Sequence, residues 1–161
     1  MPVASCSLSE AELEEIGPSA VDGHLSSSVY FSTIDTPENL AFVARYNAAF
    51  PAGPAMSADA EASYIAVRLL RQALAAAGTD NVGAVRAAVV GQRLAAPQGN
   101  VRIDKQTMHA YLTPRIGRSN REGRFDVILQ AAEPVRPDPY LVQTAPRYAL
   151  QGCAPRLRLV Q

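Results

Sequence analysis

The stretch Tyr30-Phe31-Ser32-Thr33-Ile34-Asp35-Thr36-Pro37-Glu38-Asn39 organises the rest of this chain. A strand-like run ends at Phe31, and a helix begins with Thr36 as its N-cap residue and Pro37 at its first position. Two regular elements therefore meet in a short turn that directly follows an aromatic pair. Because loops between a strand and a helix N-terminus are common places for binding, this turn is the first candidate for a functional site.

Length and composition describe one ordinary folded domain. The chain has 161 residues, of which 48% are hydrophobic and 19% charged. Fifteen basic residues balance fifteen acidic ones, so net charge provides no attraction to nucleic acid or to an anionic membrane. No apolar run approaches the roughly 18 residues of a membrane span, so no membrane insertion is expected. No signal peptide is visible at the N-terminus.

Hydrophobic periodicity and capping signals predict an α/β protein. Helices are expected at residues 9–16, 37–50, 57–77 and 81–90, and strands near 3–7, 24–31, 99–103, 108–119 and 125–131. The strand centre Ser26-Ser27-Ser28 is weak strand material, which favours an edge strand, with burial against a hydrogen-bonding group as the alternative. The expected apolar faces comprise Leu40, Val43, Ala44, Asn47 and Phe50 in the second helix, Ala62, Ile65, Ala66, Leu69, Leu70 and Ala73 in the third, and Val82, Val85 and Val89 in the fourth.

The order of these elements is unusual for one compact domain. Three helices with apolar stripes follow one another, yet few strands are present for them to cover. We therefore expect that the sheets on which these helices pack are missing from the chain. Exposed apolar helix faces would then drive homodimerisation.

Five motifs occur in order along the chain. They are Ser9-Glu10-Ala11-Glu12, Tyr30 to Pro37, Ala60-Glu61-Ala62-Ser63-Tyr64, Ala96-Pro97-Gln98-Gly99-Asn100-Val101 and Pro134-Val135-Arg136-Pro137-Asp138-Pro139-Tyr140. Together they resemble the C-terminal part of the amide- and urea-binding branch of the type I periplasmic-binding-protein fold. The resemblance covers about residues 2–142. It implies that this chain is less than half of a protein with two α/β lobes that close on a ligand.

The resemblance also implies where each segment belongs. Residues 1–142 would contribute to both lobes, with the first strand and helix in the C-terminal lobe and helices two to four in the N-terminal lobe. The hinge would be formed by Ser32, Thr33, Ile34 and Asp35, in the second crossing between lobes. The chain would return to the C-terminal lobe from about Val101. Residues 143–161 are expected to form a loosely structured tail.

Two functions follow from the resemblance, and a third reading does not depend on it. The first is a solute-binding protein for urea or short-chain aliphatic amides that feeds an ABC permease from outside the cytoplasm. The second is a cytoplasmic amide sensor that regulates amidase expression through an antiterminator partner. The third is a truncated stand-alone interaction module with no ligand binding.

Candidate ligand-binding residues are few, because family members take most ligand contacts from a first half that this chain lacks. They are Ser5, Ser7, Tyr30, Phe31 and Glu61. The two serines follow the first strand, where open α/β sheets place ligands. The aromatic pair walls the cleft or, as the ordinary alternative, belongs to the core. Glu61 contacts the ligand or is a first-turn acid favoured by the helix dipole.

Other conspicuous residues point to structural roles. His24 and His109 lack metal-ligand spacing, and no nucleophile–base motif is present, so neither a metal, a cofactor nor an enzyme activity is expected. Cys6 and Cys153 are expected to be unpaired thiols. Arg136 and the prolines around it are expected to fix an extended segment. The arginine-rich run 115–124 is expected to be a solvated hairpin.

Overall fold

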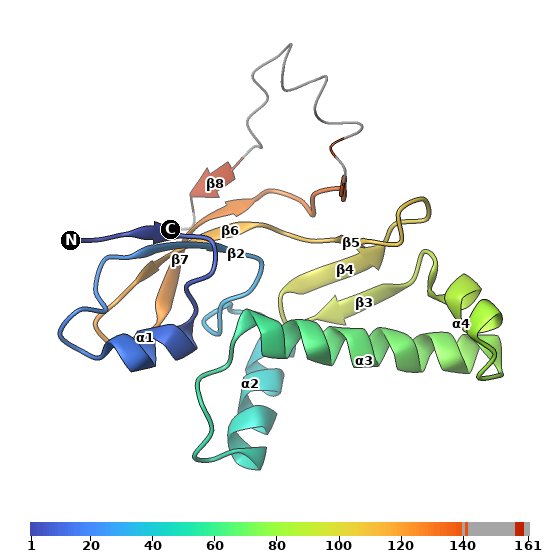
Figure 1. Cartoon of the computed structure of the whole chain (residues 1–161), viewed down its shortest axis with the longest axis horizontal. Coiled ribbons are helices and arrows are strands. Elements are labelled where there is room, and N and C mark those ends of the chain that lie inside the picture. Colours follow the sequence, from blue (N-terminus) through green and yellow to red (C-terminus); the bar gives the residue numbers. More distant parts are fainter. Residues whose placement is uncertain (140, 142–156, 160–161) are drawn as a thin grey trace, which may run out of the picture.

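The protein is built on two β-sheets that lie side by side, with helices packed against them (Figure 1). The computed structural model describes residues 1–139, 141 and 157–159. The first sheet has the order β1-β2-β6-β7-β8, with strands Ala4–Ser5, Leu25–Ser28, Arg115–Ser119, Phe125–Ala131 and Leu157–Leu159. The second sheet has the order β3-β4-β5, with strands Arg93–Ala96, Gly99–Ile103 and Ala110–Tyr111. The predicted α/β class is confirmed.

All four predicted helices are present, because their terminal signals work as expected. They are α1 (Glu10–Ile16), α2 (Pro37–Ala49), α3 (Ala58–Ala77) and α4 (Val82–Val89). The Thr36 hydroxyl accepts a hydrogen bond from the Asn39 amide at 3.2 Å, and Ser57 caps α3 in the same way through Ala60. Gly78 ends α3 in the left-handed conformation, with φ of 63°.

The strand expected over 108–119 is wrong as a single element. Residues 110–111 form β5 in the second sheet, and residues 115–119 form β6 in the first. Pro114 lies between them, and its missing amide hydrogen and fixed φ interrupt the ladder. The chain therefore returns to the first sheet at residues 112–114 and not from Val101 as expected. Strand β3 was not predicted, because Arg93-Leu94-Ala95-Ala96 contains little β-branched or aromatic character.

The serine-rich strand β2 is not an edge strand, so that expectation is wrong. It pairs in parallel with β1 and antiparallel with β6. Ser26 is buried, and its hydroxyl donates to the Leu8 carbonyl at 2.6 Å. A buried hydroxyl with a nearby acceptor is satisfied locally, so the alternative of burial against a hydrogen-bonding group is the observed one.

Three hydrophobic clusters hold the fold together. The first cluster contains Leu13, Val21, Phe31 and Phe125 and packs α1 on the first sheet. The second contains Ile65, Leu69, Leu94, Ala96, Val101 and Ile103 and packs α3 on the second sheet. The third contains Tyr30, Ile34, Phe42 and Met56 and lies at the start of α2. Gly117 lies so close to Phe31 that an added Cβ would be 2.8 Å from the Phe31 ring, which requires glycine there.

Helix α2 does not bury the face that the sequence predicts. Asn39 and Phe42 are buried, whereas Leu40 and Phe50 are 60% and 58% exposed. The capped first turn points Asn39 into the crossing segment, and this polar contact sets the rotation of the helix. The prediction fails because the periodic spacing of Leu40, Val43, Ala44, Asn47 and Phe50 contains no sign of the polar contacts that bury Asn39.

Helix α3 buries Ile65, Leu69 and Ala73 as expected, but Ala62, Ala66 and Leu70 of the predicted face are exposed, so that part of the expectation is wrong. Val67, Leu70 and Leu74 are 65%, 49% and 40% exposed. Their spacing places them on one side of the helix. We call these three residues the exposed α3 stripe. Val82 of α4 is 80% exposed, so its expected inward orientation is wrong.

Several remaining sequence expectations concern the ends of the chain. The expected loose tail, residues 143–161, lies outside the described residues except for 157–159, which form β8 antiparallel to β7. Cys153 also lies outside them, and Cys6 is exposed and free. No helix of the described part is long and apolar enough to cross a membrane.

Candidate functional site at the crossing between the sheets

In the described part of the chain, residues 29–36 and residues 112–114 are crossing segments that run between the two sheets. In Figure 1 the first leaves β2 and enters α2, and the second leads from β5 into β6. Buried polar side chains gather around these segments. Because backbone between regular elements has no ladder of its own, side chains can supply the hydrogen bonds that its buried groups need.

Asn39 fixes the shape of the first crossing segment. Its side-chain amide donates to the Ser32 carbonyl at 2.8 Å and to the Ile34 carbonyl at 2.7 Å. Its carbonyl oxygen accepts the Tyr30 hydroxyl at 2.8 Å. Asn39 is fully buried and uses both donors and its acceptor. The Tyr30–Ile34 turn is therefore held by the first turn of α2.

Tyr30 and Phe31 are both buried, and they belong to different clusters. Tyr30 packs with Phe42 and Met56, whereas Phe31 stacks on Phe125 at 4.9 Å between ring centroids. The aromatic pair therefore links the core of the first sheet to the core at the start of α2. Burial, with Glu61 and Glu10 nearby, raises the pKa of Tyr30 well above its usual value, so its hydroxyl stays protonated as a donor.

Glu61 lies in a second polar network with Gln98 and Arg115. Its carboxylate accepts from the Gln98 backbone amide at 3.1 Å and from the Gln98 side-chain amide at 3.0 Å. Arg115 donates to the Gln98 carbonyl at 2.8 Å, to the Val29 carbonyl at 2.6 Å and to the Thr113 carbonyl at 3.1 Å. One guanidinium thus contacts the β3–β4 turn and both crossing segments.

Burial shifts the acid–base behaviour of this network. Desolvation raises the pKa of Glu61 to about 7, against the hydrogen bonds from Gln98 and the nearby Arg115 charge. Desolvation also lowers the pKa of Arg115, and the charge of Glu61 opposes that shift. Glu61 is therefore a buried carboxyl group that titrates near neutral pH.

Two of the predicted hinge residues are held by the first sheet and its helix α1. The Ser32 amide donates to the Glu10 carboxylate at 2.8 Å, and the Thr33 hydroxyl donates to the Phe125 carbonyl. Burial raises the pKa of Glu10, against its hydrogen bonds from Ser32. Ile34 is buried and Asp35 is exposed. Glu10 and Ser32 also line a hollow of about 310 Å³ between α1 and α2.

Ser5 and Ser7 lie apart from these networks, at the end of β1. Their hydroxyl oxygens are 3.3 Å apart, and the Ser7 amide donates to the Ser5 hydroxyl at 3.1 Å. The structure therefore brings Tyr30, Glu61 and the hinge to the crossing region, while the serines lie at the strand end. Ser9, by contrast, is the N-cap residue of α1.

Several site residues were missed from the sequence. Asn39 and Gln98 lie beside or within two of the five motifs, and Arg115 lies outside them, but nothing in their spacing shows that they are buried. Arg115 was expected in a solvated hairpin, and it is instead 6% exposed, so that expectation is wrong for this residue. Arg121 fits the expectation, since its side chain is 86% exposed in an ion pair with Asp22.

The histidines and Arg136 have structural contacts. His24 accepts the Val3 amide at 3.2 Å, and a His109 ring nitrogen lies 2.8 Å from the Thr107 carbonyl. Arg136 contacts Asp104 at 3.7 Å and Gln106 at 2.6 Å, which ties its segment to the second sheet. Among the residues that the structure describes, no group of His, Cys, Asp and Glu side chains could hold a metal ion.

The arrangement of two sheets joined by crossing segments is explained by the family to which the chain belongs. The family model for the periplasmic binding protein domain matches residues 1–146. The chain belongs to the periplasmic binding protein domain family. Members of this family are binding proteins, and the expectation that the chain is not an enzyme agrees with this membership.

Solved periplasmic binding proteins share the arrangement. A solute-binding protein of an ABC transporter from R. palustris, in complex with 4-hydroxybenzoate, is 27% identical, with a TM-score of 0.71 over 84% of this chain and 37% of that chain. A second, from Rhodopseudomonas palustris HaA2 in complex with p-hydroxybenzoic acid, is 28% identical, with a TM-score of 0.65 over 74% of this chain and 33% of that chain. The chain spans about one third of the length of these relatives.

A curated relative has an enzyme name. Limonene hydroxylase from Geobacillus stearothermophilus is 24% identical over 129 residues, which are 80% of this chain and 24% of that protein. Because the match covers about a quarter of that protein, the activity in its name is not assigned to this chain.

The raised pKa of Glu61 predicts a pH dependence of stability. Its carboxyl titrates near 4.5 when unfolded and about 7 when folded, so its contribution is complete below about pH 4.5 and is lost as the pH rises through about 7. At about 1.4 kcal/mol per pKa unit, this loss is on the order of 3 kcal/mol. In Glu61→Gln the residue stays neutral, so urea unfolding between pH 4 and 8 should show a flatter profile.

The exposed Glu38 provides the matched control, because Glu38→Gln removes a carboxylate on α2 outside the network. This variant should keep the wild-type pH profile. A residual slope in Glu61→Gln is expected, because the pKa of Glu10 is also raised. Superimposable pH profiles for Glu61→Gln and the wild type would contradict the prediction.

Proposed function

We propose that this chain is the C-terminal part of a solute-binding protein that delivers a small molecule to an ABC permease. Family membership over residues 1–146 carries this proposal, and the two solute-binding relatives of ABC transporters support it. In this proposal residues 1–142 contribute the first sheet to one lobe and the second sheet to the other. The protein would act outside the cytoplasm.

Binding would proceed by lobe closure, with residues 29–36 and 112–114 as hinge strands. Two observations support a hinge there. The crossing segments connect separate hydrophobic clusters, and their backbone is held by side chains of Asn39, Glu10 and Arg115. Such bonds define the path of the crossing backbone, while Tyr30, Phe31 and Ile34 anchor the first segment in the clusters on either side.

We propose urea or a short-chain aliphatic amide as the ligand, on the basis of the five ordered motifs. A neutral amide needs donors and acceptors in a dry cleft and no charged partner. The candidate ligand-binding residues of this chain remain Ser5, Ser7, Tyr30, Phe31 and Glu61. Tyr30 and Phe31 are buried, so any contribution they make would come from within the core. Aromatic carboxylates are the second candidate class, because the two relatives bind hydroxybenzoates.

The cytoplasmic amide sensor with an antiterminator partner remains the alternative for the same fold and ligand class. The two differ in compartment and gene neighbourhood. A signal peptide encoded upstream of residue 1 would favour the transporter subunit. Adjacent antiterminator and amidase genes would favour the sensor. A stand-alone interaction module is the remaining alternative, and ligand titration separates it from both.

Ligand titration tests the proposal in two steps. We expect calorimetry to detect no binding of urea, acetamide or 4-hydroxybenzoate to residues 1–161 alone, because the chain spans about one third of its relatives. We expect a polypeptide extended by the upstream reading frame to bind acetamide or urea more tightly than 4-hydroxybenzoate. The reverse preference would contradict the proposal that the ligand is an amide. Micromolar binding by residues 1–161 alone would contradict the proposal that the ligand lies in a cleft shared with the rest of the protein.

We also propose that the isolated chain self-associates through the exposed α3 stripe. Val67, Leu70 and Leu74 are apolar and exposed along one side of a 20-residue helix. Light scattering should show an apparent mass that rises with protein concentration. Leu70→Lys should shift the chain toward monomer, whereas Val135→Lys, at a 45% exposed position away from α3, should not. A monomer at all concentrations would contradict this proposal.

A further inference from the structure

The outer face of the second sheet carries two arginines that lie directly opposite each other. Arg93 of β3 pairs with Arg102 of β4, and Arg102 pairs with Tyr111 of β5. The alternating residues Leu94 and Val101 are buried against α3, so the three paired side chains lie on the other face. We call Arg93, Arg102 and Tyr111 the arginine row.

Like charges directly opposite each other destabilise an antiparallel pair. In the described part of the chain, neither Arg93 nor Arg102 forms an ion pair or a hydrogen bond that would offset this repulsion. Arg102 lies over the Tyr111 ring, with its central carbon 3.9 Å from the ring centroid. That contact orients one guanidinium but leaves its charge uncompensated. The sheet therefore carries a repulsive pair that a negative group would relieve.

The arginine row lines a hollow large enough for a small ligand. This hollow measures about 520 Å³, and Asn100, Glu133 and Pro134 also line it. A second hollow of about 430 Å³ shares the arginine row and adds Lys105 and Arg136. These volumes are within the range of small-molecule sites. Glu133 and Asp104 are the carboxylates among the residues lining the two hollows.

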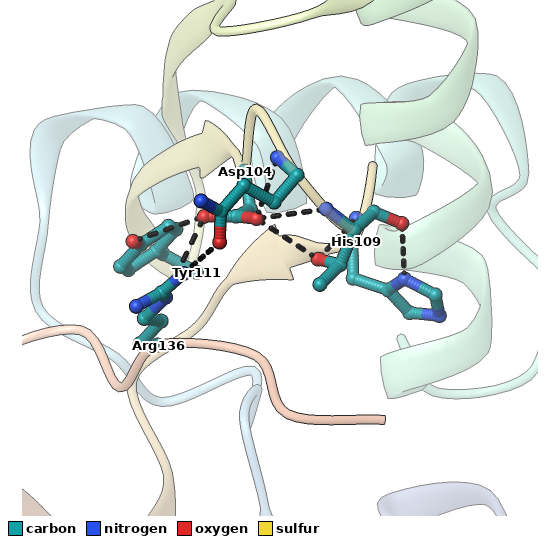
Figure 2. Close-up of polar contacts among 6 residues, drawn as sticks. Asp104, His109, Tyr111 and Arg136 are labelled. Atoms are coloured by element: carbon teal, nitrogen blue, oxygen red, sulfur yellow. Dashed lines mark hydrogen bonds and ion pairs between the residues drawn. The ribbon is translucent and has the colours of Figure 1, made fainter. Parts of the chain in front are cut away.

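The Asp104 carboxylate already has hydrogen-bond partners in its own turn, as Figure 2 shows. Its carboxylate accepts from the Gln106 and Thr107 amides, both at 2.9 Å, and from the Tyr111 hydroxyl at 3.2 Å. It also contacts Arg136 at 3.7 Å. These hydrogen bonds, led by that of Thr107, lower the pKa of Asp104 to about 2. Asp104 thus fixes Tyr111 and partners Arg136, and it is not paired with Arg93 or Arg102.

We propose that the arginine row binds a small oxyanion, a carboxylate or a phosphate group, between the Arg93 and Arg102 guanidiniums. Planar guanidiniums donate pairs of hydrogen bonds that match such oxygens. Tyr111 would provide the fixed platform for Arg102, and Asn100 a neutral polar neighbour. This site differs from the proposed amide cleft, because a neutral amide has no need of two cationic partners.

Calorimetric titration of the 161-residue chain with sodium phosphate and with sodium benzoate, at constant ionic strength, tests the proposal. We expect saturable binding of at least one probe. Arg93→Ala/Arg102→Ala should weaken it about tenfold or more, because charge-assisted hydrogen bonds are lost. Arg71→Ala/Arg86→Ala removes the same charge from exposed positions on α3 and α4 and should keep wild-type affinity. Binding of benzoate alone indicates a carboxylate site, and binding of phosphate alone indicates a phosphate site.

A charge reversal keeps the test decisive if the double variant folds poorly. Arg93→Glu would place opposite charges across β3 and β4, which stabilises the pair, and it should abolish oxyanion binding. Three results would overturn the proposal. They are no saturable binding of either probe, wild-type affinity in Arg93→Glu or in the double arginine variant, and an equal loss in the Arg71 and Arg86 control.

Discussion

The Arg115 guanidinium is the contact on which the crossing region depends. It donates to the carbonyls of Val29, Gln98 and Thr113, which lie in three different parts of the chain. Arg115 is nearly buried, so these bonds form where water does not compete strongly. Glu61 completes the network through Gln98 and provides the nearby opposite charge. Removing the guanidinium would leave buried carbonyls without donors.

A polar crossing suits a binding protein in which two lobes must move. Each sheet packs its own hydrophobic cluster, with α1 against the first and α3 against the second. The third cluster, which contains Tyr30 and Ile34, packs against Val127 of the first sheet and Tyr64 of α3, so the connection between the sheets combines apolar contacts with directional hydrogen bonds. The hydrogen bonds specify one arrangement of the crossing backbone. In the proposed function, ligand closure would bend these segments while both cores stay intact.

Local signals in the sequence predicted much of the fold. The caps at Thr36 and Ser57 and the stop at Gly78 define helices within about two residues of their observed ends, as is usual for such signals. The motif resemblance led to the correct family, whereas its urea and amide branch remains a proposal. The predicted hinge residues lie in a crossing segment, but Ser5 and Ser7 lie apart from it.

The remaining features depend on tertiary contacts that no local pattern records. Arg115 resembles its solvated neighbours in sequence, and its burial follows only from β6 lying beside the β3–β4 turn. From the sequence, no side-chain role is predicted for Asn39, whose buried partners are the Ser32 and Ile34 carbonyls and the Tyr30 hydroxyl. The Ser26 strand was expected at an edge because serine is weak strand material, whereas its hydrogen-bond partner, the Leu8 carbonyl, lies outside the strand. Arg115 and Ser26 are satisfied by segments distant in sequence, whereas Asn39 is satisfied by the turn that precedes its own helix.

Residue-resolved urea unfolding of Arg115→Met tests most directly whether the polar network couples the two sheets. In the wild type, NMR signals of Val127 in the first sheet and Val101 in the second should disappear in one transition. The variant keeps a side chain of similar length without donors, so the two residues should unfold at separate urea concentrations. A single transition with an unchanged midpoint in Arg115→Met would contradict the claim that this network joins the sheets.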